Sequence, residues 1–177
     1  DFVLPLGSLR EFKRGKKRAQ TIIITKCPSN LTLQNRVDFK NKISLLHNQE
    51  IFFTKIKYSE IVLSYNQKLD FESLGSSKIT LVTGIADSQP LVEFLNFKNI
   101  SFNHLKYRDH FNYNESDIKK IKNVAGSSII LTTEKDYGKI YPLLKSSKIF
   151  YLPISLDFFS FNEENEFDKR IKSFIKN

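Results

Sequence analysis

The sequence predicts an α/β fold built on a layered, mostly parallel sheet, and three observations lead to that prediction. Short apolar runs rich in Ile, Val and Leu alternate with stretches of helical period, the order that produces a parallel sheet covered by helices. The 177 residues are 40% hydrophobic, which is enough for one domain or two small ones. Polar stretches follow the apolar runs at TGIADS (83–88), YRDHF (107–111) and TTEKD (132–136). Because ligands gather at the carboxyl ends of parallel strands, these three stretches are expected to share one edge of the sheet.

The regular alternation begins with an apolar strand that leads to a turn at Gly84 and then to a helix. Asp87 or Ser88 is expected to cap this helix, and Pro90 fits its first turn. Its inner face is predicted to consist of Leu91, Phe94 and Leu95. The elements expected after it are a strand at 101–109, a helix at 114–126, strands at 127–136 and 148–158, and a terminal helix at 163–177.

Two of these helices carry further signals. Asn114, followed three residues later by Asp117, resembles a capping box at the start of the helix 114–126. The terminal helix is expected to bury Phe167, Ile171 and either Phe174 or Ile175.

The first third of the chain is less regular. QTIIITKCP (20–28) predicts a buried strand that ends at a proline. Residues 30–46 place four apolar side chains at mostly helical spacing: Leu33, Val37, Ile43 and Leu46. Residues 49–65 predict two strands that meet near 57–60, and the polar segment 66–78 is the best linker candidate.

Composition narrows the function classes. No run is long and apolar enough to cross a bilayer, and no segment has the pattern of a signal peptide. The single Cys27 cannot form an internal disulfide, and one cysteine with three scattered histidines excludes Cys/His metal clusters. An excess of 28 Lys and Arg over 19 Asp and Glu gives a net charge of +9, which favours nucleic acid, anionic lipid or phosphorylated ligands as partners. Part of that excess lies in one cluster, which is either a solvated loop or an anion-binding surface: Lys13, Arg14, Lys16, Lys17 and Arg18.

Three short motifs are candidate sites, and each has a plainer structural interpretation. TGIADSQP could hold a phosphate on backbone amides, but a plain strand-to-helix turn explains it better because no P-loop or dinucleotide fingerprint occurs. TTEKD is either a capped polar turn or a strand end that binds a ligand. In RDHF, His110 beside Asp109 suggests proton transfer. However, neighbouring residues of a strand point to opposite sides, so the two side chains need not pair.

Several separated stretches together resemble one family, the tetraacyldisaccharide 4'-kinases of lipid A biosynthesis. The stretches are LPLGSLRE (4–11), RAQTIIITKCP (18–28), TGIADSQP (83–90), YRDHFNYNESDI (107–118) and ILTTEKDYGKI (130–140). Their order and spacing fit the family across nearly the whole chain.

The resemblance implies a membrane-associated bacterial kinase with two α/β domains and a β-ribbon linker. Such an enzyme transfers the γ-phosphate of MgATP to the 4'-hydroxyl of a tetraacyldisaccharide 1-phosphate and gives lipid IVA. The family's P-loop and acidic Mg²⁺ ligands lie upstream of the LRE stretch, so ATP and Mg²⁺ are expected to bind mainly outside these residues. The resemblance divides the chain into the end of the first domain (1–60), a linker (61–77) and a P-loop or Rossmann-like C-terminal domain (78–177). A monomer on the cytoplasmic side of the inner membrane is expected, with an anionic membrane surface and a glycolipid substrate as partners.

The resemblance also implies roles for single residues. Arg10 and Glu11 match residues near the nucleotide phosphates and the metal. His110 matches a histidine that works with an aspartate of the upstream domain to activate the sugar hydroxyl, and Asp109 would orient it. The residues that match a box lining the interdomain cleft are Thr133, Glu134, Lys135 and Asp136. Two departures affect these roles: Phe111 replaces the family's second histidine, and GIAD replaces its usual Gly-Asn turn.

Two other functions are compatible with parts of the sequence. A basic α/β module that binds nucleic acid would explain the charge, but the sequence shows no RNP, KH or helix-turn-helix signature and no row of stacking aromatic residues. A sugar-nucleotide transferase of related architecture does not account for the whole set of motifs.

Overall fold

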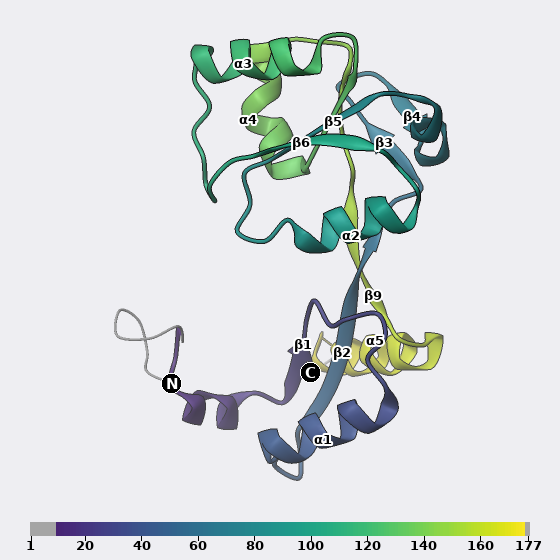
Figure 1. The fold of residues 1–177 in the computed structure, drawn as a ribbon. Coiled ribbons are helices and arrows are strands. Elements are labelled where there is room, and N and C mark those ends of the chain that lie inside the picture. The colour runs from purple at the N-terminus through teal and green to yellow at the C-terminus, as the bar shows by residue number, and fades with distance from the viewer. Residues whose placement is uncertain (1–9, 176–177) are drawn as a thin grey trace. The chain divides into compact units, whose positions relative to one another are not determined.

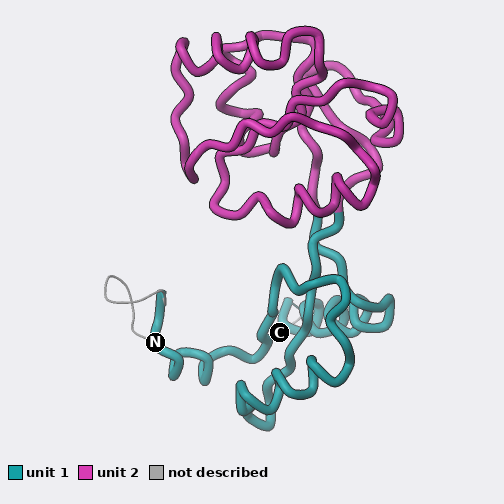
Figure 2. Tube along the Cα trace, in the orientation of Figure 1, with its two compact units in different colours: residues 1–57, 155–177 teal, residues 58–154 magenta. Residues whose placement is uncertain are grey.

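The structure is a computed structural model that describes residues 10–175, and its elements form two compact units. Unit 1 comprises residues 1–57 and 155–177, and unit 2 comprises residues 58–154 (Figures 1 and 2). In chain order, unit 2 is therefore inserted between two parts of unit 1. This confirms the α/β class that the alternation of strands and helices predicts.

Unit 1 is built on a three-stranded sheet in the order β1-β2-β9, in which β1 and β2 run parallel. Its elements are η1 (Lys13–Arg18), β1 (Thr21–Ile24), α1 (Leu33–Ile43), β2 (Glu50–Tyr58), β9 (Ile154–Phe158) and α5 (Phe161–Ile175). The buried core centres on Phe52 and Phe53 of β2. The Phe52 ring packs edge-on against Phe167 of α5, with ring centroids 5.3 Å apart. Arg170 attaches α5 to the sheet by donating to Thr21 Oγ1 at 2.9 Å and to Glu50 Oε1 at 2.6 Å.

Several apolar residues of unit 1 are less buried than the sequence predicts. Strand β1 is confirmed, but Ile23 is 42% exposed, so it is not a fully buried strand. Three of the four apolar positions of segment 30–46 are exposed: Leu33, Val37 and Leu46. Of the four apolar positions predicted to be buried in α5, only Phe167 is half-buried, whereas Ile171, Phe174 and Ile175 are exposed. Among the described residues, both helices pack on the same three-stranded sheet, through Phe39 of α1 against Phe53 and Phe167 of α5 against Phe52.

Unit 2 contains a six-stranded sheet in the order β4-β3-β8-β7-β5-β6. Its strands are β3 (Ile61–Leu63), β4 (Lys68–Asp70), β5 (Ile79–Thr83), β6 (Phe102–Lys106), β7 (Ile129–Thr132) and β8 (Ile149–Tyr151). Its helices are η2 (Phe71–Ser76), α2 (Gln89–Phe97), α3 (Glu115–Ala125) and α4 (Glu134–Leu144). The four strands β6, β5, β7 and β8 are parallel, and β3 and β4 extend the sheet in antiparallel pairing. The mostly parallel sheet is therefore confirmed.

The two faces of this sheet carry separate apolar clusters. Leu91 and Leu95 of α2 pack with Leu81 of β5 on one face. On the other face, Ile121 of α3 and Ile140 of α4 belong to a second cluster with Val82. Neighbouring residues of β5 thus point to opposite faces, as expected of a strand buried on both sides. Every residue of β5 is buried, which makes this strand the rigid centre of the unit.

The local predictions in unit 2 are confirmed at two helix starts. Ser88 is the N-cap residue of α2, and the Asp87 carboxylate accepts the Gln89 N–H at 2.9 Å. Asn114 caps α3 and forms the predicted capping box with Asp117.

The structure differs from the sequence prediction at three longer segments. The predicted linker 61–77 contains β3, β4 and η2, because its short strands pair with β8 and with each other. The predicted strand 148–158 is two strands, β8 and β9, which belong to different sheets on either side of Pro153. The strand predicted at 127–136 ends at Thr132, and residues 134–144 form helix α4, which the sequence reasoning missed.

Candidate functional site

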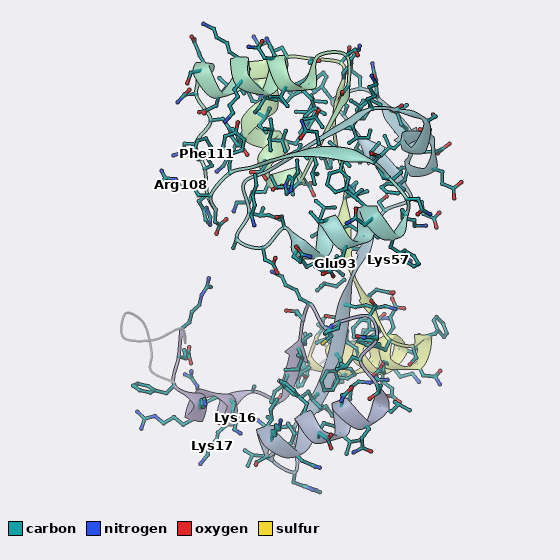
Figure 3. All side chains as sticks on the ribbon, viewed as in Figure 1. Lys16, Lys17, Lys57, Glu93, Arg108 and Phe111 are labelled. Carbon is teal, nitrogen blue, oxygen red and sulfur yellow. The ribbon has the colours of Figure 1, made fainter. Side chains whose placement is uncertain are left out.

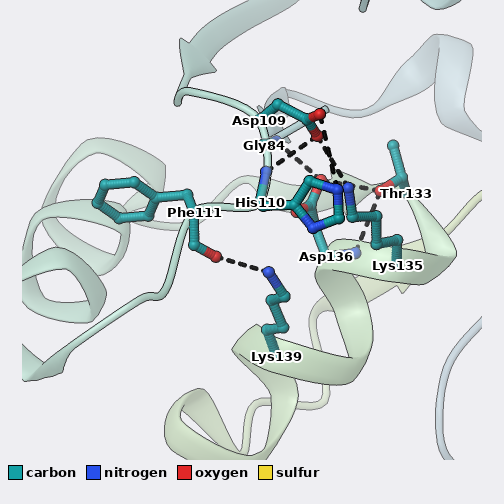
Figure 4. A network of polar contacts seen from close by, with 8 residues as sticks. All are labelled: Gly84, Asp109, His110, Phe111, Thr133, Lys135, Asp136 and Lys139. Atoms are coloured by element: carbon teal, nitrogen blue, oxygen red, sulfur yellow. Dashed lines mark hydrogen bonds and ion pairs between the residues drawn. The ribbon is translucent and has the colours of Figure 1, made fainter. Parts of the chain in front are cut away.

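The three polar stretches meet at the carboxyl edge of the parallel strands in unit 2, as predicted. The Tyr107 N–H donates to the Thr83 carbonyl at 2.7 Å, joining the ends of β6 and β5. The Thr132 hydroxyl donates to the Val82 carbonyl at 2.7 Å, joining β7 to β5. Gly84, directly after β5, contacts α4, directly after β7. Figure 4 shows the network that results.

Asp136 is the fully buried centre of this network. Its Oδ2 atom accepts the Gly84 N–H and the Thr133 hydroxyl, both at 2.8 Å. In return, Thr133 caps α4 by accepting the Asp136 N–H at 3.2 Å. A carboxylate in the first turn is also stabilised by the partial positive charge of the helix N-terminus. Thr133 and Asp136 of the TTEKD box therefore bind the start of α4 to the end of β5.

Gly84 is required by close packing at this position. A Cβ atom there would lie 2.8 Å from the Tyr113 hydroxyl and 2.9 Å from Asp136 Oδ1. The surrounding turn lies at the topological switch point of the sheet, because β5 leads to α2 on one face and β7 leads to α4 on the other. The Gly84 N–H is already bonded to a carboxylate, so it is not available to a phosphate. The interpretation of TGIADSQP as a structural turn fits this geometry.

The loop between β6 and α3 packs on an aromatic cluster made of Tyr107, Phe111 and Tyr113. Ring centroids are 4.7 Å apart for Tyr107 and Phe111, and 5.1 Å apart for each of the other two pairs. Burial and the neighbouring Asp136 carboxylate raise the pKa of Tyr113 far above its ordinary value, so this hydroxyl stays protonated. Arg108 lies over the Phe111 ring at 5.9 Å (Figure 3). Phe111 therefore has a packing role where the family motif has a histidine.

His110 stands out from this loop. Its side chain is 78% exposed, and its backbone is left-handed, with φ at 55°. Its N–H donates to Asp109 Oδ1 at 2.9 Å, but its ring Nε2 lies 3.8 Å from Asp109 Oδ2, which is too long for a hydrogen bond. In this structure Asp109 fixes the backbone of His110 and leaves its imidazole open to solvent.

Asp109 has a second partner, Lys135. The Lys135 ammonium donates to Asp109 Oδ1 at 2.8 Å, and this hydrogen bond lowers the pKa of the Asp109 carboxyl. The bond brings together two motifs that the sequence analysis treated separately. Glu134, between Thr133 and Lys135, is exposed, and its side chain makes no ion pair or hydrogen bond within residues 10–175.

Lys139 is a member of the network that the sequence reasoning missed. Its ammonium donates to the Phe111 carbonyl at 2.8 Å. The signal was its position four residues after Lys135, which places both side chains on one face of a helix. That signal becomes visible only if helix α4 is predicted. Gly84 and Tyr113 were likewise not identified as site residues.

The basic cluster of unit 1 lies on and around η1. A hollow there is lined by Arg10, Glu11, Phe12, Arg14, Gly15 and Arg18. Glu11 forms an ion pair with Arg18, and Arg14 lies 5.1 Å from the centroid of the exposed Phe12 ring. Lys16 donates to the Ile43 carbonyl, and Lys17 is exposed (Figure 3). The LPLGSL part of the first motif, residues 4–9, lies outside the described residues.

One sequence argument against nucleic-acid binding needs correction, because the described chain does contain a row of stacked aromatic rings. Tyr65, Tyr141 and Tyr137 stack at 5.7 Å and 5.1 Å, and Tyr151 follows at 4.9 Å. These residues are far apart in sequence, so the row is not visible there. Because the rings stack mainly on one another, only Tyr65, which is 76% exposed, presents an open ring.

The described residues contain neither a candidate metal cluster nor a candidate membrane span. From residue 10 to residue 175, no group of three or more His, Cys, Asp and Glu side chains is arranged to hold a metal ion. Over the same span, no helix has both the length and the hydropathy required to cross a membrane.

Comparisons with known proteins place this geometry in a family. Proteins named tetraacyldisaccharide 4'-kinase are 36% identical in Flavobacterium johnsoniae over 176 residues and 30% identical in Bacteroides thetaiotaomicron over 197 residues. Both alignments cover 99% of this chain and 51% of the relative, so the chain spans about half the length of the curated relatives it matches.

A solved structure shares the fold. It is LpxK from Aquifex aeolicus in complex with ATP, with a TM-score of 0.63 and 20% identity over 97% of this chain and 48% of that one. The sequence profile of the family described as Tetraacyldisaccharide-1-P 4'-kinase (LpxK) matches residues 1–176. This chain therefore belongs to the tetraacyldisaccharide-1-phosphate 4'-kinase family.

Proposed function

We propose that this chain is part of a lipid A 4'-kinase. The enzyme transfers the γ-phosphate of ATP to the 4'-hydroxyl of a tetraacyldisaccharide 1-phosphate, giving lipid IVA in lipopolysaccharide biosynthesis. The observation that carries the proposal is the family match over residues 1–176, which includes both halves of the polar network in unit 2. Because this chain spans only about half the length of its relatives, we expect the chain alone to be inactive.

In this proposal His110 accepts the proton of the sugar hydroxyl. An exposed imidazole at the carboxyl edge of a parallel sheet is accessible to a substrate, and histidine changes its protonation near neutral pH. Phosphoryl transfer requires accurate positioning and charge stabilisation more than covalent chemistry, so a base near the acceptor oxygen is a sufficient role. Asp109 holds the backbone of His110 in this structure. As the family resemblance implies, the imidazole would work with an aspartate that lies outside these residues.

The residues around η1 fit phosphate chemistry. Arg10, Arg14 and Arg18 supply guanidinium groups around one hollow, and guanidinium binds phosphate oxygens in pairs. Glu11 carries the carboxylate that Mg²⁺ prefers as a ligand, directly or through water. We assign ATP and Mg²⁺ mainly to the part of the enzyme that precedes this chain, with Arg10 and Glu11 in their vicinity. Mg²⁺ would offset the charge of the transferred phosphate when bound.

The proposed partners follow from charge and substrate. A net charge of +9 suits an enzyme that takes a phosphorylated glycolipid from an anionic membrane surface. The exposed Phe12, with the Arg14 guanidinium over its ring, is suited to the interfacial region of a bilayer. We propose a peripheral protein on the cytoplasmic side of the bacterial inner membrane, acting as a monomer.

The test is product formation by the full-length protein. It would be incubated with radiolabelled ATP, Mg²⁺ and tetraacyldisaccharide 1-phosphate, and the lipid fraction separated by chromatography. The label is expected in a lipid product that carries one additional phosphate. Two control reactions, one without Mg²⁺ and one with a 4'-deoxy acceptor, should form no labelled product. Absence of labelled lipid from a folded, ATP-binding full-length protein would contradict the proposal.

The nucleic-acid alternative finds no support in the comparisons, whose names describe a lipid A kinase family. Tight binding of RNA or DNA, with an affinity that falls steeply as the salt concentration rises, would support this alternative.

A further inference from the structure

Helix α4 contacts the His110 loop through two lysines spaced one turn apart. Lys135 donates to the Asp109 carboxylate and Lys139 donates to the Phe111 carbonyl, both at 2.8 Å. The two acceptors belong to the residues directly before and after His110. Figure 4 shows both lysines extending from α4 toward this short segment.

The segment between these contacts has a backbone conformation that needs support. His110 adopts φ of 55°, in the left-handed region that residues other than glycine seldom occupy. Conformations of this kind persist where surrounding contacts determine them, and they concentrate at functional sites. The Asp109 carboxylate supplies one contact by accepting the His110 N–H at 2.9 Å, and Lys135 holds that same oxygen.

The helix that carries the two lysines is itself firmly placed. Ile140 and Leu144 of α4 are buried in the core, and Asp136 bonds to Gly84 at the end of the fully buried strand β5. Contacts from α4 therefore hold the loop in a fixed position relative to the sheet. Arg108 does not offer this, because it lies in the loop itself, over the Phe111 ring.

We propose that Lys135 and Lys139 form a clamp that fixes residues 109–111 and thereby positions His110 for phosphoryl transfer. The inference rests on the proposed function for the role of His110, but the clamp itself concerns only the loop. Both lysines are positioning residues, because each acts through a neighbour of His110 and neither contacts its imidazole in this structure. Two separate contacts restrict the segment more than one, since each fixes a different end of it.

The test uses the full-length protein with Lys135→Met and Lys139→Met, singly and together. Methionine matches the lysine side chain as far as Cε and removes the ammonium. Lys135→Arg retains a donor and should behave like the wild type. Lys119→Met is the matched control, because Lys119 is an exposed lysine of α3 whose side chain makes no hydrogen bond or ion pair within residues 10–175.

Two readouts separate the clamp from a general effect on stability. The His110 N–H is bonded to Asp109, and loss of either lysine contact should loosen this segment. Amide hydrogen exchange of His110 should therefore become roughly ten-fold faster in each single variant, which corresponds to a loss of about 1.4 kcal/mol of local protection. Turnover should fall by about ten-fold or more with unchanged KM for ATP, as expected when a reacting group is misplaced but the nucleotide site is intact.

Unchanged exchange at residues 109–111 in the double variant would overturn the clamp. Faster exchange with wild-type turnover would overturn its positioning role. Wild-type turnover of His110→Ala would instead contradict the role of His110 in the proposed function, and the exchange measurement would still decide whether the lysines hold the loop.

Discussion

The Gly84 N–H donates a 2.8 Å hydrogen bond to the buried Asp136 carboxylate, across 52 positions of the sequence. This bond joins the end of β5 to the start of α4. At the switch point of the sheet, the Gly84 N–H is therefore occupied by a carboxylate of the protein itself. Its stability consequences can be measured separately from activity.

Replacing Asp136 by Ala should destabilise the protein by about 2–3 kcal/mol, because it leaves the buried Gly84 N–H without an acceptor and removes a partner of Thr133. Urea unfolding followed by circular dichroism measures the change. The neighbouring Glu134→Ala is the control and should change stability by less than about 0.5 kcal/mol, because Glu134 is exposed. Equal effects of the two substitutions would contradict the central place given to Asp136.

Two glycine substitutions should have opposite signs. Gly84→Ala should cost about 1–3 kcal/mol, since the added Cβ would lie 2.8 Å from the Tyr113 hydroxyl and 2.9 Å from Asp136 Oδ1. Gly138→Ala, inside α4, should stabilise by about 0.5–1 kcal/mol, since a Cβ there meets nothing within 4 Å. Thermal unfolding of both variants compares them directly. A stabilised Gly84→Ala protein would show that the turn is more open than described.

His104 should make stability depend on pH. Burial, and to a lesser extent Lys106, lowers the pKa of His104 below its ordinary 6.5, and its Nε2 lies 2.9 Å from the Thr83 hydroxyl. The unfolded chain therefore binds a proton more readily than the folded chain. The contribution to stability is complete above pH 6.5 and is lost as pH falls through the lower pKa of the folded state.

The measurement is the urea midpoint at several pH values between neutral and mildly acidic. The wild type should lose stability over this interval, and His104→Gln should lose less. The exposed His47→Gln is the control and should keep the wild-type slope. If His104→Gln kept that slope too, the buried interaction would not explain it.

Asp109 gives a second test of the same kind. Its hydrogen bond from Lys135 lowers the pKa of the carboxyl below its ordinary 3.8. The bond is therefore complete above pH 3.8 and is lost as pH falls through the lower folded-state pKa. Carbon-detected NMR of the Asp109 carboxyl should give a midpoint below 3.8, and Lys135→Met should raise it. A midpoint that Lys135→Met leaves in place would show that the ion pair does not persist in solution.

The sequence predicted local features well and non-local ones poorly. The capping box of Asn114 and Asp117 lies within four residues, so its chemistry is visible in the sequence. Helix α4 was missed because Gly138 and Pro142 interrupt its helical signal. They are four residues apart, so the hydrogen bond that Pro142 cannot donate falls on the Gly138 carbonyl.

The division of the chain required tertiary information. Residues 148–158 form one apolar run, but the partners of its two parts lie far away in sequence, with β8 beside β7 and β9 beside β2. For the same reason the strands β3 and β4 look like a linker until β8 is beside them. The site followed this pattern: the three polar strand ends were expected at one edge, but the contacts of Lys135 and Lys139 depend on a helix that was not predicted.

The most direct test of the central claim is the single-turnover rate of phosphoryl transfer in the full-length protein with His110→Ala, compared with His47→Ala. Both histidines are exposed, so neither substitution should unfold the protein. Loss of a general base predicts that His110→Ala lowers the rate at least about 100-fold and leaves the affinity for ATP unchanged. His47→Ala should transfer phosphate at the wild-type rate. Transfer by His110→Ala at the wild-type rate would contradict the account.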